Sequence, residues 1–261
     1  MIRVMSFNIR YGLAPDGENH WHNRKRLALT RIQAFGPDLV GLQECRDDEQ
    51  QAAFIRQGLP GYHFYGIHRG GGGDTALEMA PLLFRQATFT LLDAGCFWLS
   101  ETPEVPGSMS WGSAYARTVS WAKLSCRATG RVLTYANTHF DYEPEAVVNH
   151  ARCLRHWLDQ VGKEMPLILT GDFNADKAGE SYLLLTGGGL GDAFRLAHPH
   201  GQDEITYHAY DDLEDKERAA IDWILVSNHF RVKEVQVDRS REGRLFPSDH
   251  YPITALLDWR E

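Results

Sequence analysis

The sequence predicts an α/β protein in which a mixed β-sheet system carries helices on its outside. Strand patterns outnumber helix patterns along the 261 residues, and strand-turn-strand meanders are mixed with strand-helix-strand units. A chain of this length can bury a substantial core. Neither a linker composition nor a repeat of fixed period interrupts it, so we expect a single domain over residues 1–261.

Strands and helices alternate in the first quarter of the chain. Residues 3–9 alternate as a strand does, and residues 23–35 have the composition of a helix that ends at Gly36 and Pro37. A short apolar strand at 38–44, a helix at 48–57 and a strand at 62–67 follow.

The middle of the chain reads as a meander of four strands, at residues 79–85, 89–99, 116–126 and 131–139. Residues 69–74, RGGGGD, precede it as a flexible loop. A phosphate cradle is disfavoured there because no Lys-Ser/Thr pair follows the glycines. Residues 100–113 contain prolines and form a long loop.

The remaining elements lead into and out of a central strand. A helix at 143–162 carries leucines on one side and returns the chain to the strand that begins at Leu167. The later elements are a helix at 180–185, a glycine-rich turn at 187–191, a charged loop at 211–218, strands at 220–226, 230–237 and 251–259, and a basic loop at 238–247.

Composition limits the possible partners and compartment. Acidic residues outnumber basic ones by 35 to 27, for a formal charge of −8, so a long polyanion does not suit the surface as a whole. No apolar run reaches the roughly 18 residues of a membrane span, and the N-terminus resembles a strand more than a signal peptide. We expect a cytoplasmic protein with four reduced cysteines, and nothing indicates a protein partner.

The chain is organised around the segment LILTGDFN, residues 167–174. Alternate side chains of a strand share a face, so Asp172 and Asn174 can point into one cleft while Phe173 turns into the core. A rigid strand that ends in polar groups is a common place for chemistry.

Many other predicted strands end in a similar polar group. These endings are Asn8, Glu44, His139 with Asp141, Asp222, and Asp249 with His250. Their number suggests convergence on one cleft, where the carboxylates would repel one another unless a cation is present. Oxygen ligands without cysteine favour Mg²⁺, with Mn²⁺ as a substitute, over zinc.

These motifs together resemble those of the endonuclease/exonuclease/phosphatase superfamily. The matching segments, in order, are SFN at 6–8, QE at 43–44, NTHFD at 137–141, GDFN at 171–174, IDWILVS at 221–227 and SDH at 248–250. The resemblance implies a deoxyribonuclease I-like four-layer α/β/β/α sandwich of two mixed sheets flanked by helices. It also implies metal-dependent hydrolysis of phosphate esters by a bacterial-type, single-domain member.

The resemblance assigns roles to the strand-end residues. Glu44, with Asn8 beside it, and Asp249 correspond to metal ligands. Asp172 corresponds to the residue that orients or deprotonates the attacking water, and Asn174 to the residue that holds this water or a phosphate oxygen. Two further correspondences are His250 as a donor to the phosphoryl oxygen and Asp222 as the residue that fixes its tautomer.

The same resemblance pairs Glu78 with His139 in a second histidine-carboxylate pair. Arg117 lies where relatives place a phosphate-contacting arginine, and Asp141 is a candidate substrate contact. A surface ion pair or a strand-end cap would explain Glu78, Arg117 and Asp141 equally well.

Two loops contain basic residues that could bind phosphate. Arg241 and Arg244 lie in the loop at 239–244, which is either a local phosphate grip or a solvated turn. Trp21 and Arg24 could add a stacking surface and a further cation.

The leading functional hypothesis is therefore a Mg²⁺-dependent phosphodiesterase or phosphomonoesterase that uses a metal-oriented water. The alternatives are a nuclease on short single-stranded or nicked nucleic acid, a non-catalytic binding module that has kept the fold, and a structural protein stabilised by a cation. Substrate choice depends on the loops at 12–24, 69–78, 101–114, 175–190 and 208–218, which contain no motif that names a substrate.

Overall fold

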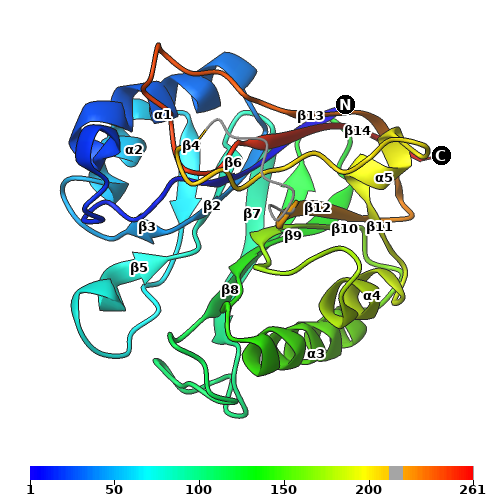
Figure 1. Ribbon diagram of the computed structural model, residues 1–261. Coiled ribbons are helices and arrows are strands. Elements are labelled where there is room, and N and C mark those ends of the chain that lie inside the picture. Colours follow the sequence, from blue (N-terminus) through cyan, green and yellow to red (C-terminus); the bar gives the residue numbers. More distant parts are fainter. Residues whose placement is uncertain (212–219, 261) are drawn as a thin grey trace.

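The computed structural model describes residues 1–211 and 220–260, and two six-stranded mixed sheets dominate it (Figure 1). The first sheet has the strand order β13 (Phe230–Val237), β14 (Ile253–Trp259), β1 (Ile2–Asn8), β2 (Leu39–Gln43), β6 (Leu82–Arg85) and β4 (Tyr62–Tyr65). The second has the order β11 (Leu190–Asp192), β12 (Asp222–Ser227), β10 (Leu167–Asp172), β9 (Val132–His139), β8 (Thr118–Cys126) and β7 (Phe89–Trp98). In each sheet one pair, β1 with β2 and β9 with β10, is parallel.

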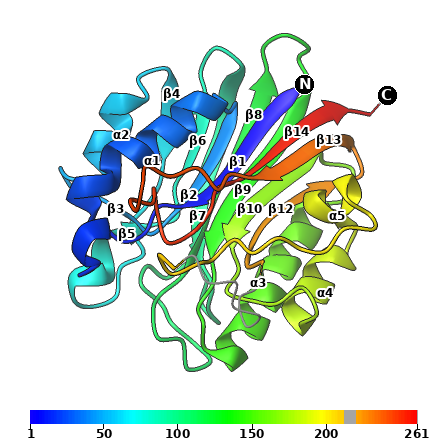
Figure 2. The ribbon, with the colours of Figure 1, turned by 45° about the horizontal axis from the view of Figure 1, so that its top comes forward.

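The two sheets pack face to face (Figure 2). Their inner faces share one apolar cluster, in which Val4 and Leu39 of the first sheet meet Tyr135, Ile168 and Ile224 of the second. Strands buried on both faces explain why β2 and β10 read as continuous apolar runs.

Helices cover the outer faces. On the first sheet lie α1 (Trp21–Phe35) and α2 (Ala52–Gly58), and on the second lie α3 (Pro144–Val161) and α4 (Glu180–Thr186) (Figure 2). α1 ends at Gly36, whose φ of 60° is the left-handed conformation that glycine adopts without strain. The layers follow the order α/β/β/α, as predicted.

Local differences from the predicted elements have physical causes. The strand predicted at 79–85 is interrupted at Pro81: β5 (Glu78–Met79) pairs with β3 (Cys45–Arg46), whereas β6 joins the first sheet. The helix predicted at 48–57 begins at Ala52, because the carboxylate of Asp48 accepts hydrogen bonds from the backbone N–H groups of residues 50 and 51 in a turn.

Several short elements were not predicted. Two of them, β11 and α5 (Ala193–Ala197), lie in and just after the glycine-rich segment that reads as a turn. All four cysteines are free thiols. Among the described residues, no helix combines the length and apolarity needed to cross a membrane.

A polar bridge joins the two sheets near the ends of their central strands. Asn137 donates to the backbone carbonyls of Leu42 and Pro81 at 2.7 and 2.9 Å, and Gln43 donates to the Asn137 Oδ1 at 2.7 Å. A Cβ on Gly41 would collide with Asn137 and Thr170, so glycine permits this close approach. The bridge sets the distance between the strand ends that carry the site.

Candidate active site

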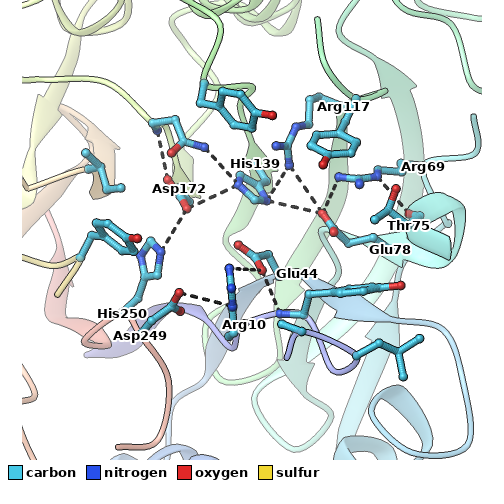
Figure 3. A pocket seen from close by; sticks show the side chains of 18 of the residues that line it. Arg10, Glu44, Arg69, Thr75, Glu78, Arg117, His139, Asp172, Asp249 and His250 are labelled. Carbon is cyan, nitrogen blue, oxygen red and sulfur yellow. Dashed lines mark hydrogen bonds and ion pairs between the residues drawn. The ribbon is translucent and has the colours of Figure 1, made fainter. Parts of the chain in front are cut away.

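The ends of the central strands surround a cavity of about 500 Å³ (Figure 3). Register brings them together, because His139 of β9 pairs with Asp172 of β10, and Asp172 pairs with Asp222 of β12. The polar residues that line the cavity are Arg10, Glu44, Arg69, Thr75, Glu78, Arg117, His139, Asp172, Asn174, Asp249 and His250, together with the tyrosines at 11, 115, 142 and 207.

Asp172 and Asn174 point into the cavity from the end of β10, as predicted, while Phe173 is fully buried. Asn174 adopts a left-handed φ of 45°, and the Asp172 Oδ1 accepts its backbone N–H at 3.0 Å. The Asp172 Oδ2 accepts a hydrogen bond from Asn8 at 2.9 Å. Burial and the charge of Asp222 raise the pKa of Asp172 to about 7.

His250 forms a close pair with Asp222. Its Nδ1 lies 2.8 Å from the Asp222 Oδ2, and its Nε2 lies 3.7 Å from the Asp172 Oδ2. Burial opposes a charged imidazole, but Asp222 and Asp172 outweigh it and raise the pKa of His250 to about 10. The predicted His250–Asp222 pair is therefore present, with the Nδ1 proton directed at Asp222.

The three residues Asp172, Asp222 and His250 are also close enough to share a metal ion, since one ligand atom of each lies within 4.8 Å of the others. We favour a proton-handling group, because the short His250–Asp222 hydrogen bond already uses one atom of each.

His139 lies on the other side of Asp172, with Nε2 3.5 Å from the Asp172 Oδ2. Its Nδ1 is 2.9 Å from Arg117 and 3.7 Å from Glu78, so Arg117 makes the contact that was predicted for Glu78. A guanidinium can only donate, so Nδ1 accepts from Arg117 and the proton of a neutral ring lies on Nε2, which is also 3.2 Å from the Asn174 amide nitrogen. Burial and Arg117 hold the pKa of His139 well below its usual value, so this histidine is neutral.

Glu44 and Asp249 face the cavity on either side of Arg10 (Figure 3). The Arg10 guanidinium lies 3.9 Å from the Glu44 Oε2 and 3.5 Å from the Asp249 Oδ2, and it forms two hydrogen bonds of 3.1 Å with Asp16. Burial would raise the pKa of Glu44, but Arg10 and Asn8 lower it. Burial raises the pKa of Asp249, and Glu44 adds to the rise.

This donor set fits a hard divalent cation. Glu44, Asp249 and Asp172 bring carboxylate oxygens to one cavity. Repulsion from Glu44 raises the pKa of Asp249, and repulsion from Asp222 raises that of Asp172, so the cavity demands positive charge that Arg10 meets only in part. Asn8 donates to Glu44 at 3.0 Å and to Asp172, and its Oδ1 accepts the Arg10 backbone N–H at 2.9 Å. The geometry makes Asn8 a support for both carboxylates, and its role as a ligand stays a prediction.

At the other end of the cavity, Glu78 lies between two arginines (Figure 3). It accepts a hydrogen bond from Arg69 at 2.6 Å and lies 3.5 Å from Arg117. Burial raises the pKa of Glu78 to about 7, although both arginines oppose the rise.

Comparison with known proteins identifies the family. Residues 5–250 match the model of the Endonuclease/Exonuclease/phosphatase family. The chain belongs to this family. Sequence motifs and the α/β/β/α architecture both agree with this membership.

Individual members of the family resemble the chain over its full length. An endonuclease/exonuclease/phosphatase from Bacteroides vulgatus is 32% identical, with a TM-score of 0.89 and 99% of both chains covered. A mannosyl-6-phosphatase from Bacteroides thetaiotaomicron is 31% identical, with a TM-score of 0.87 over 99% of this chain and 100% of that one. Nocturnin from Rattus norvegicus is 28% identical over 98% of this chain, which spans only 64% of that relative's length.

Arg10 and Arg69 are cavity residues of this family member that sequence reasoning did not single out. Arg10 directly follows the strand predicted at 3–9, and Arg69 begins the glycine-rich loop. Arg10 lies outside the quoted motifs, whereas Arg69 is the first residue of the RGGGGD segment, for which a phosphate-binding role was disfavoured.

Three predicted substrate contacts are instead buried parts of the framework. Trp21 is 2% exposed and Arg24 is 0% exposed, which excludes a stacking surface at this place. Arg24 donates to the backbone carbonyls of Ile9 and Pro247 at 2.7 and 2.9 Å and so ties two loops together. Asp141 is 0% exposed and accepts the backbone N–H groups of residues 115, 142 and 143, so it holds the turn that leads into α3.

The basic loop does not reach the cavity. Asp238 pairs with Arg31 of α1 at 3.8 Å, and Phe246 donates to Asn19, so the loop runs along α1 (Figure 2). Arg241 and Arg244 are exposed and are not among the cavity residues. The phosphate-grip interpretation is therefore not supported, and most of the charged loop at 211–218 lies outside the described residues.

Proposed function

We propose that this chain is a metal-dependent phosphoesterase, with Mg²⁺ as the expected ion and Mn²⁺ as a substitute, that hydrolyses a phosphomonoester or phosphodiester of a small molecule. The observation that carries the proposal is the position of Asp172 between a cationic and a neutral histidine, 3.7 Å from His250 and 3.5 Å from His139. All three open into the same cavity as Glu44 and Asp249.

Each residue has a role in in-line attack by water. Asp172 orients the water and accepts its proton, for which a pKa of about 7 suits a neutral solution. Asn174 holds the water or a phosphate oxygen. His250 donates from Nε2 to the phosphoryl oxygen as negative charge develops, and Asp222 keeps its ring in place. His139 offers a second donor from its Nε2.

Glu44 and Asp249 are the proposed metal ligands. A bound divalent cation would act there as a Lewis acid on the phosphate. Asn8 keeps both Glu44 and Asp172 oriented toward the cavity through its amide group. In the absence of substrate, Arg10 balances part of the negative charge of the ligands.

A small substrate is favoured over a long nucleic acid. The cavity volume of about 500 Å³ lies within the usual range for small-molecule sites. Its arginines lie inside the cavity, whereas the exposed arginines of the 239–244 loop lie away from it. The full-length similarity to a bacterial mannosyl-6-phosphatase supports a sugar phosphate as the first substrate to test.

The test is a panel of phosphate esters assayed with Mg²⁺ and with Mn²⁺. It contains sugar phosphates, mononucleotides, dinucleotides, short oligonucleotides and inositol phosphates. We expect the highest kcat/KM on a small ester and loss of turnover in chelator. A higher kcat/KM on oligonucleotides would replace the proposal by the nuclease alternative, and binding without any turnover would indicate a non-catalytic module.

A further inference from the structure

The far end of the cavity from His250 is a pair of arginines (Figure 3). Arg69 and Arg117 are each 4% exposed, and both line the cavity. Their guanidinium carbons lie 4.4 and 5.3 Å from the ring centre of Tyr115. Burying two cations beside one aromatic ring is costly unless anions compensate them.

The anions of the protein compensate this pair only in part. Glu78 is shared between the two arginines, and its pKa of about 7 leaves it partly protonated at neutral pH. The Nε of Arg117 lies 3.6 Å from the Asp141 Oδ2, which is an ion-pair distance but too long for a hydrogen bond. This end of the cavity therefore suits one more acceptor with negative charge.

Arg69 is held rigidly in this position. Its backbone N–H donates to the Glu78 carbonyl at 2.7 Å, and its carbonyl accepts the Trp98 indole N–H at 2.6 Å. Its Nε donates to the Thr75 carbonyl at 3.1 Å. A cation fixed from three directions loses little conformational freedom when it binds a ligand.

The arginine pair also lies next to the proposed reaction centre. Arg117 contacts one nitrogen of the His139 ring at 2.9 Å, and the other nitrogen lies 3.5 Å from Asp172. A group bound by the arginines would therefore be separated from the phosphate undergoing attack by about the width of the His139 ring.

The geometry points to a second anion subsite at Arg69 and Arg117, which selects phosphate esters that carry another acidic group close to the scissile phosphate. The inference rests on the proposed function and narrows its substrate class to doubly anionic small molecules. The second group can be a carboxylate, a sulfate or a phosphate, because each offers charged oxygens to a guanidinium.

A matched pair of aryl esters tests the subsite. 4-Carboxyphenyl phosphate carries a second anion, whereas 4-carbamoylphenyl phosphate has the same shape without the charge. We expect the wild-type protein with Mg²⁺ to prefer the carboxylate ester by about tenfold in kcat/KM, and Arg69→Met to lose this preference. Arg69→Lys retains the charge without the planar fork and should keep a reduced preference.

The control is Arg85→Met, which removes an arginine that pairs with Asp38 at 3.6 Å and does not line the cavity. It should retain the wild-type preference. Equal kcat/KM for the two esters in the wild-type protein, or the same preference in Arg69→Met as in Arg85→Met, would overturn the subsite.

A binding measurement separates this inference from the proposed function. 4-Carboxyphenylphosphonate and 4-carbamoylphenylphosphonate have no scissile ester, and calorimetry with Mg²⁺ gives their affinities for the wild-type protein and for each variant that folds. Tighter binding of the carboxylate compound, lost in Arg69→Met or weakened in Arg69→Lys, supports the subsite even if neither ester is hydrolysed. Equal wild-type affinities would overturn it whatever the turnover.

Discussion

His250 and His139 flank the same carboxylate and yet differ in charge. His250 faces Asp222 and Asp172, which raise its pKa to about 10, whereas His139 faces Arg117 and stays neutral. A cationic donor and a neutral donor on opposite sides of Asp172 can both hold a phosphate oxygen, but only His250 brings positive charge to it.

Replacing Glu44 with Gln keeps the side-chain shape and removes one charge from the proposed metal site. We expect hydrolysis to fall by roughly three orders of magnitude at low Mg²⁺ and to recover in part at high Mg²⁺ or Mn²⁺. Steady-state rates over a metal titration measure this. A near wild-type rate at low metal would show that Glu44 is not a ligand.

His250→Ala should lower turnover by about 10²- to 10³-fold, because it removes a charged donor to the phosphoryl oxygen. Asp222→Asn should give a smaller defect of the same kind, since the carboxylate lies 2.8 Å from His250 Nδ1. Calorimetry of metal binding is the control. If the variants lose metal affinity but keep their turnover per bound ion, both residues act in metal binding and not as donors to the phosphoryl oxygen.

Arg10 and Arg69 show what residue-level reasoning could not reach. Arg10 contacts Asp16 and Arg69 contacts Glu78, six and nine positions away, and no motif marks either pair in the sequence. The prediction for Trp21 was wrong in the opposite sense. This residue was expected in a loop that contacts the substrate, but it is the first residue of α1 and is buried in the core.

At the scale of elements, α3 and the loop at 100–113 are linked by His150. Its Nε2 lies 3.2 Å from the Ser113 hydroxyl, and its Nδ1 accepts the Asp141 backbone N–H at 3.3 Å. Burial, with Arg117 adding, lowers the pKa of His150 from 6.5 to about 3. The contact between α3 and this loop therefore requires His150 to be neutral.

The sign of the resulting pH dependence follows from linkage. In the unfolded chain His150 becomes protonated below its pKa of 6.5, whereas in the folded chain it stays neutral down to about pH 3. The free energy of unfolding should therefore fall by about 1.4 kcal/mol per pH unit in this window because of His150. Urea denaturation of His150→Gln should show a shallower acid dependence than wild type, and identical slopes would contradict the assignment.

The 239–244 loop gives a second prediction at this scale. It runs along α1 and away from the cavity, so Arg241→Glu with Arg244→Glu should leave KM for a polyanionic ester within about twofold at low salt. The measurement is KM over a salt series. A large rise in KM that added salt abolishes would restore the phosphate-grip interpretation.

The ends of helices and strands were hardest to predict where one residue, such as a proline, interrupts an otherwise regular pattern. Pro81 breaks the expected strand at 79–85 because it cannot continue the ladder, and the first half then turns to pair with β3 and carries Glu78 to the cavity. Strand ends with apolar runs before them, such as Asp172, were placed correctly since the period-2 pattern defines their face.

At the scale of the whole molecule, the two sheets act as the frame of the site. Asn8 and Glu44 come from the first sheet and Asp172 from the second, and they meet through hydrogen bonds of 3.0 and 2.9 Å. The inter-sheet bridge at Asn137 fixes this spacing. Binding a cation between the sheets should therefore stabilise the entire fold.

Adding Mg²⁺ at about a hundredfold excess over its Kd should raise the free energy of unfolding by about 2.7 kcal/mol and Tm by several degrees. Chelator should reverse the shift. Glu44→Gln should show a much smaller response to Mg²⁺, and thermal denaturation monitored by circular dichroism measures both. An equal Tm shift in the variant would place the stabilising cation elsewhere.

The sequence by itself determined the strand-end residues through local periodicity, and the family and the layer order through the resemblance that its short motifs carry. Tertiary structure decided which basic residues reach the cavity and which histidine is charged. These properties depend on burial and on partners 22 to 39 positions apart in the sequence, such as Arg117 at His139, Arg117 at Glu78, and Asp222 at His250. No local pattern encodes such distances, since the charge on a buried group is set by whatever the folded sheets place beside it.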